Sequence, residues 1–126
     1  MKMITQLHPV DQIDLDRAQL STLYTQLGPV GAEDVVCRAM EELALRLSLC
    51  DRLHRAAHLV ELRKNTRSLV AIAQQIGMSG VANVATDVTA CIDAENHVGL
   101  AATMNRLMRT GEASLTAIWE MQDIQV

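Results

Sequence analysis

The chain contains few aromatic, glycine and proline residues, and this scarcity excludes most β architectures. Among its 126 residues are one Trp, one Tyr, no Phe, six Gly and two Pro, although 49% of the residues are hydrophobic. Strands favour aromatic and β-branched side chains and are separated by closely spaced turn residues, whereas no glycine or proline lies between Gly31 and Gly77. We therefore expect neither a β-sandwich nor a barrel, and the core must be built from aliphatic side chains.

Four absences narrow the class of protein further. Aromatic residues that could stack on bases are almost missing and the formal net charge is −4, which argues against a nucleic-acid partner. No apolar run approaches the roughly 20 residues of a membrane span, and residues 1–10 lack the continuous apolar stretch of a signal peptide. The three cysteines, Cys37, Cys50 and Cys91, form no CxxC pair and predict reduced thiols. We expect one cytoplasmic domain without nucleic-acid or membrane partners.

Apolar residues recur at helical spacing along most of the chain, which predicts an all-α fold. A short helix over 14–27 ends at Gly28-Pro29, and its first turn is capped by Asp14 or a neighbouring Asp. The longer segments together form an up-and-down four-helix bundle. We expect these longer helices within 33–76, which holds two of them, and over 80–94 and 97–121.

The stretch 33–76 contains two apolar stripes with no helix breaker between them. The first stripe steps by four and three residues through Val36, Met40, Leu43, Leu47 and Cys50. The second stripe runs through Leu59, Leu62, Thr66, Leu69, Ala73 and Ile76. One bent helix of about 45 residues would be roughly 65 Å long, which suits a dimer better than a compact monomer. We therefore expect two antiparallel helices joined by a turn within 49–60.

The ends of the chain and its last two helices are assigned from weaker signals. Residues 1–12 are expected to form a tail or a short lead-in helix, 13–122 the bundle and 123–126 a second tail. Ser79 is expected to cap the helix over 80–94, for which a strand is the alternative because Val and Thr dominate it. In the helix over 97–121, the expected inward residues are Met104, Leu107, Met108, Leu115, Ile118 and Trp119.

Candidate metal and catalytic sites are weak. Cys50, His54 and His58 are spaced four residues apart, but Cys50 and His58 are separated by about 12 Å of helix. A zinc metalloprotease motif needs Glu after the first His, where this chain has Arg55. No nucleophile-elbow or phosphate-binding glycine motif is present. We therefore expect helix-surface histidines, no metal, no cofactor and no enzyme.

Positive charge is concentrated in the middle of the chain. Six of the eleven Lys and Arg residues lie between Arg46 and Arg67, opposed only by Asp51 and Glu61. On the helix over 59–76, the face away from the apolar stripe carries Val60, Arg63, Lys64, Arg67, Ala71 and Gln74. This face is either an ordinary solvated helix surface or a docking face for an acidic partner, which charge would steer into place.

The sequence E-L-R-K-N-T-R-S-L-V-A-I-A-Q-Q-I-G over 61–77 resembles the central helix of a histidine phosphotransfer (HPt) domain. Within the family motif H-x-L-K-G-x-[AS]-x-x-[LI]-G, the matching residues are Leu69, Ala73, Ile76 and Gly77. Residues 13–28 and 33–47 resemble the first two helices of the family, so the resemblance covers about 13–121. It implies an HPt-like helical bundle that acts in two-component phosphorelay signalling.

The chain departs from the family at the residues that carry its chemistry. Arg67 stands at the position of the phosphoacceptor His, Val70 at that of the Lys and Ala71 at that of the small Gly. Because a guanidinium stays protonated, it cannot act as the phosphoryl nucleophile. The resemblance therefore implies a module that binds a receiver domain or a histidine kinase without carrying phosphate itself. Its expected partner-binding residues are Arg63, Lys64, Arg67, Val70, Ala71 and Gln74.

Two alternatives remain open at this point. The chain could be an active phosphotransfer protein that uses His58 or His54 instead of the motif His. It could also be a structural helical protein that forms a homodimer through its unbroken 33–76 stretch and the outward residues Val60 and Ala71.

Overall fold

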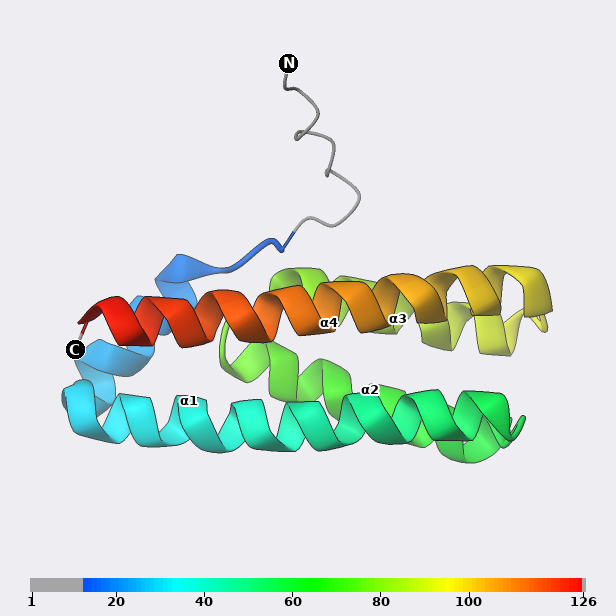
Figure 1. Ribbon diagram of the computed structural model, residues 1–126, viewed down its shortest axis with the longest axis horizontal. Helices are drawn as coiled ribbons and strands as arrows, with labels where there is room; N and C mark the ends of the chain where they lie inside the picture. The colour runs from blue at the N-terminus through cyan, green and yellow to red at the C-terminus, as the bar shows by residue number, and fades with distance from the viewer. Residues whose placement is uncertain (1–12, 126) are drawn as a thin grey trace, which may run out of the picture.

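The computed structural model describes residues 13–125, with side chains as far as Met121, and these residues form four helices and no strand. The helices are α1 (Arg17–Arg55), α2 (Leu59–Gln75), α3 (Ser79–Asp93) and α4 (His97–Gln125). Consecutive helices are antiparallel and packed together, and α4 closes the bundle against α1 (Figure 1). The predicted all-α fold is therefore confirmed, and the strand considered for 80–94 is wrong.

A break at Gly28 divides α1 into a short and a long segment. Gly28 has φ 76° and ψ 166°, a conformation that is essentially restricted to glycine, and Pro29 begins the long segment. Asp16 caps the short segment, because its Oδ1 accepts a hydrogen bond of 3.1 Å from the backbone N–H of Gln19. Figure 1 shows the short segment crossing one end of the bundle, near the end of α4. The predicted break and cap are both confirmed.

Three turns of the same design join the four helices. Each ends its helix with a residue of positive φ, and the next N–H bonds back to the carbonyl five residues earlier, as in a Schellman motif. The residues of positive φ are Ala57, Gly77 and Glu95. The returning hydrogen bonds are His58 N to Leu53 O at 2.9 Å, Met78 N to Ala73 O at 2.8 Å and Asn96 N to Cys91 O at 2.9 Å. The first turn falls within 49–60 as predicted, so the single bent helix is wrong.

The predicted apolar stripes form the core of the bundle. All members of the two stripes within 33–76 are buried except Leu59, which is half-buried. Trp119 is a correction, because its side chain is 61% exposed rather than inward-facing. The inward face of this part of α4 passes through Gly111, Ser114 and Ile118, and Trp119 lies about 100° around the helix from Ile118.

Ser79 does not cap α3 as expected. The helix begins at Ser79, its N-cap is Met78, and no side chain supplies a capping hydrogen bond there. The N-terminal end of α3 is instead fixed by the chain that precedes α1. Gly80 N donates to Asp14 O at 3.0 Å, and Asp16 N donates to Gly77 O at 2.6 Å.

The outer limits of the bundle were predicted less well. Helix α4 continues to Gln125, past residue 122, where we expected the bundle to end. The tail expected over 1–12 lies outside the described residues. None of the helices described within 13–125 combines the length and the apolar composition of a membrane-spanning segment.

Candidate functional site

A groove of about 440 Å³ lies on the surface between α2 and α3. It contains four of the six residues expected to bind a partner, namely Arg67, Val70, Ala71 and Gln74. The opposite wall is formed by Thr86, Thr89, Ala90 and Asp93 of α3. The structure therefore brings most of the sequence-predicted face to one place and adds a second wall to it.

The groove follows from the way α2 packs on its neighbours. Leu62, Leu69 and Ala73 are fully buried, which turns Arg67 and Ala71 outward on the opposite side of the helix. Ala90 on α3 is exposed as well. Each wall of the groove therefore carries one exposed alanine, Ala71 on α2 and Ala90 on α3.

Arg63 is paired within the chain rather than free. Its Nε and Nη2 donate to the two carboxylate oxygens of Asp93 at 2.7 and 3.1 Å. This bidentate pair ties the first half of α2 to the last residue of α3. The hydrogen bonds from Arg63 hold the pKa of Asp93 below its ordinary value, and the positive charge of Arg67 lowers it further against the opposing effect of desolvation.

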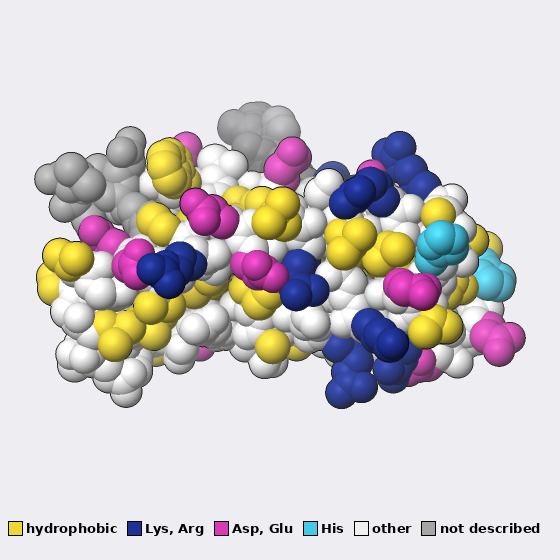
Figure 2. Space-filling model, turned by 90° about the horizontal axis from the view of Figure 1, so that it is seen from below, with side chains coloured by type: hydrophobic (Ala, Val, Ile, Leu, Met, Phe, Trp, Pro, Cys, Tyr) yellow, Lys and Arg dark blue, Asp and Glu magenta, His cyan; other side chains and the backbone are white. Residues whose placement is uncertain are grey.

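The other two cations of the predicted face are in different positions. Arg67 lines the groove and is exposed, and Asp93 is the acidic residue that shares this groove with it. Lys64 is exposed but does not line the groove. Figure 2 shows Lys and Arg side chains gathered toward the end of the molecule that also carries His side chains. The basic surface predicted from the sequence is therefore present, but one of its arginines is neutralised.

A buried polar cluster between α1 and α2 sets the rotation of α2 about its axis. Asn65 Nδ2 donates to Arg46 O at 2.9 Å and contacts Cys50 Sγ at 3.1 Å, while Asn65 Oδ1 accepts from Arg46 Nη1 at 2.8 Å. Thr66 Oγ1 donates to Leu62 O at 2.6 Å. With Asn65 and Thr66 held inside, Arg67 must point to the surface.

Burial raises the pKa of the Cys50 thiol, although hydrogen bonds from Thr66 and Asn65 and the charge of Arg46 act in the opposite direction. The raised pKa favours the protonated thiol, which is the less reactive form of cysteine. Sequence analysis did not identify Asn65, because a polar residue beside an apolar stripe gives no periodic signal.

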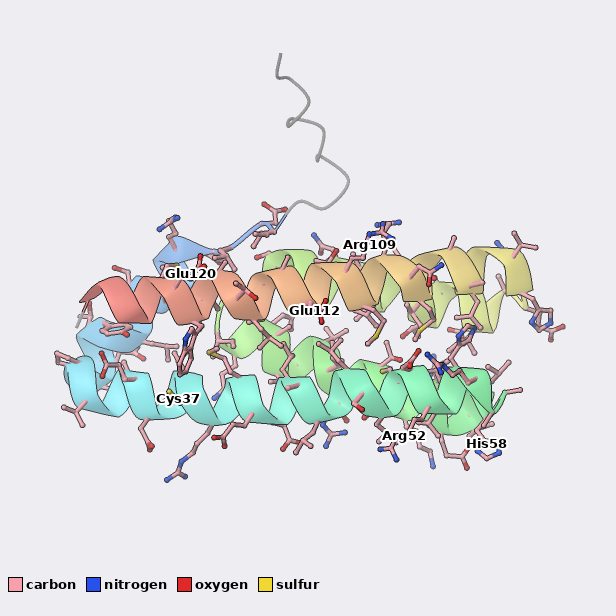
Figure 3. The ribbon with its side chains drawn as sticks, in the orientation of Figure 1. Cys37, Arg52, His58, Arg109, Glu112 and Glu120 are labelled. Carbon is pink, nitrogen blue, oxygen red and sulfur yellow. The ribbon has the colours of Figure 1, made fainter. Side chains whose placement is uncertain are left out.

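The histidines considered as ligands or phosphoacceptors lie away from the groove. His54 is half-buried near the end of α1, and His58 is exposed at the start of α2. Figure 3 shows His58 and Arg52 at the α1–α2 end of the bundle. Among the side chains that the structure describes, which end at Met121, no group of three or more His, Cys, Asp or Glu could hold a metal ion.

The α3 wall was missed by sequence analysis. Asp93 was not singled out, because nothing local indicates that it meets Arg63, which lies 30 residues earlier. Only the antiparallel packing of α2 and α3 brings the two together.

Comparison with protein-family models, curated proteins and solved structures finds no match to this chain. The fold and the groove define a small all-α bundle with a mixed-charge surface groove.

Proposed function

We propose that the chain is an HPt-like module of two-component signalling that binds a receiver domain or a histidine kinase without carrying phosphate. The observation that carries this proposal is the position of Arg67. Arg67 is exposed at a groove between two antiparallel helices, and in the register of Leu69, Ala73, Ile76 and Gly77 it replaces the phosphoacceptor His.

The chemistry of Arg67 suits binding rather than transfer. A receiver domain presents an acidic pocket around its own phosphoacceptor Asp, and a guanidinium forms strong charge-assisted hydrogen bonds with carboxylates. Ala71 and Ala90 on the two walls of the groove leave room for the rim of that pocket. Arg67 would then enter the pocket as a pseudo-substrate that accepts no phosphoryl group.

Titration of the ¹⁵N-labelled chain with purified receiver domains from the organism that encodes it tests this proposal. We expect one receiver to shift the backbone amides of 63–74 and of the α3 residues that face them. Arg67→Gln is expected to weaken this binding by about tenfold or more, because it removes a cation from the centre of the contact.

Arg52→Gln is a matched control, since Arg52 is also exposed and forms no ion pair with any described residue. Its affinity for the receiver should remain close to that of the unaltered chain. The absence of shifts at 63–74 with every receiver would show that the proposed function is wrong.

The exposure of His58 supports a second candidate, an active phosphotransfer protein. Incubation with a phosphorylated receiver, followed by detection of acid-labile phosphate, separates the two candidates. Phosphate that disappears with His58→Gln or His54→Gln would favour phosphotransfer over the binding module.

Val60 is 67% exposed on α2, which keeps the structural homodimer as a third candidate. Light scattering measures the mass in solution directly. A dimer that binds no receiver would favour the structural role.

A further inference from the structure

Asp93 places a negative charge inside the groove where the proposed partner would bind. Its carboxylate lies at the end of α3 and lines the groove together with Arg67. Both of its oxygens are used by Arg63, at 2.7 and 3.1 Å. One acidic side chain thus pairs with Arg63 and shares the groove with Arg67.

This arrangement changes which partners the groove can accept. The sequence alone suggests a face with Arg63, Lys64 and Arg67 available to any acidic surface. In the structure, Asp93 is paired with Arg63 and lines the same groove as Arg67. An acidic partner would therefore meet repulsion from Asp93 unless its carboxylates surround Arg67 directly.

We propose that Asp93 is a specificity-determining residue, because it competes with the carboxylates of a partner for the arginines of α2. The accepted partner is one whose acidic pocket encloses the guanidinium of Arg67. A partner with a diffuse acidic surface is rejected, since Asp93 is already paired with Arg63 and its carboxylate repels the acidic groups of the partner. This inference rests on the proposed function, because it concerns the selection of a receiver domain at the same groove.

A second aspartate of α3 provides a matched control for Asp93. Asp87, also on α3, pairs with Arg106 of α4 at 3.5 Å, and its side chain is 54% exposed against 53% for Asp93. The residues that line the groove include Asp93 but not Asp87. Neutralising either residue changes the net charge by the same amount, so a difference between the two variants reports on position.

The test measures the dissociation constants of Asp93→Asn and Asp87→Asn for the receiver domain that binds most tightly in the titration, and for two receivers that bind less tightly. We expect Asp93→Asn to tighten binding to the best receiver about threefold and to the weaker receivers by a larger factor. The ratio between the dissociation constants of the weaker receivers and that of the best receiver should therefore become smaller. The effect should diminish as ionic strength rises. Asp87→Asn should leave all three constants within about twofold of the unaltered chain.

A second pair of variants tests whether the negative charge of Asp93 weakens the binding of the receiver. Arg63→Gln leaves the charge of Asp93 without its partner, so we expect binding to the same receiver to weaken. In the double variant Arg63→Gln/Asp93→Asn neither charge is present, and affinity should return to near its original value. The NMR spectrum of each variant shows that the bundle remains folded.

The possible results separate this inference from the proposed function. If a receiver shifts the amides of 63–74 but Asp93→Asn leaves binding unchanged, weakens it, or matches Asp87→Asn, the role of Asp93 is wrong and the binding module stands. If no receiver shifts these amides, the role of Asp93 and the proposed function are both wrong.

Discussion

Asn65 on α2 and Arg46 on α1 are joined by two hydrogen bonds across the helix interface. Asn65 donates to the carbonyl oxygen of Arg46 at 2.9 Å and accepts from its guanidinium at 2.8 Å. Asn65 is 5% exposed, so its side chain makes these polar contacts from a buried position between the two helices. It holds α2 in the rotation that presents Arg67 to solvent.

Replacing Asn65 with alanine should destabilise the bundle by about 1–3 kcal/mol, because the hydrogen bonds from Asn65 to Arg46 and to the buried Cys50 are lost. Urea unfolding followed by circular dichroism measures the change. Asn83→Ala is the matched control, since Asn83 is exposed on α3 and the change in helix propensity is the same. Equal losses in the two variants would contradict the role given to Asn65.

Gly77→Ala should destabilise the bundle by about 2 kcal/mol or more. Gly77 has φ 76°, and a Cβ there would lie 2.6 Å from the carbonyl oxygen of Asp16, so the variant combines an unfavourable conformation with a backbone clash. Hydrogen exchange should accelerate at the amides of Asp16 and Gly80, which hold the preceding chain on this turn.

Gly28→Ala separates the effect of the unfavourable backbone conformation from the effect of the clash. Gly28 has the same φ of 76°, but a Cβ there would meet nothing within 4 Å. This variant should lose stability through conformation alone and leave exchange at Asp16 and Gly80 unchanged. Faster exchange at those amides in both variants would show that the clash is unimportant.

The Arg63–Asp93 pair should make stability depend on pH in the acidic range. Because the pKa of Asp93 is lowered in the folded state, its contribution is fully present above the ordinary aspartate pKa of about 3.9. It is lost as the pH falls through the lowered value.

Urea unfolding at a series of pH values, for the four members of the Arg63→Gln/Asp93→Asn double-mutant cycle, measures this contribution. The coupling between the two residues should be constant near neutrality and vanish in acid. A coupling that is independent of pH would contradict the charge-based account.

Restoring the three departures from the HPt motif should create a phosphoacceptor if the resemblance reflects a shared architecture. The triple variant Arg67→His/Val70→Lys/Ala71→Gly is expected to acquire acid-labile phosphate from a phosphorylated receiver that binds it. The double variant Val70→Lys/Ala71→Gly, which retains Arg67, should stay unlabelled. A triple variant that binds the receiver yet remains unlabelled would mean that the register match is fortuitous.

The helices and their inward faces could be predicted from the sequence because helical periodicity is a local property. The stripes from Val36 to Cys50 and from Leu62 to Ile76 are buried as expected, and Gly28-Pro29 breaks the first helix. The turn after Arg55 could only be placed within a range, since its residue of positive φ is Ala57. A glycine such as Gly77 indicates a residue of positive φ in the sequence, whereas an alanine at the same position does not.

The orientation of Trp119 was predicted wrongly for a related reason. Near the end of α4 the apolar pattern admits more than one inward face, and packing decides between them. Ile118 is buried and its neighbour Trp119 is not. Periodicity alone cannot rank two adjacent apolar residues.

The helical class, the core stripes and the basic residues of α2 follow from local patterns in the chain. The character of the groove depends on how the helices pack, because its second wall comes from α3. Asp93 reaches Arg63 across 30 residues of chain, and Asn65 reaches Arg46 across 19. Charge and hydrogen-bond partners at such separations are chosen by the packing of whole helices, which no local pattern records.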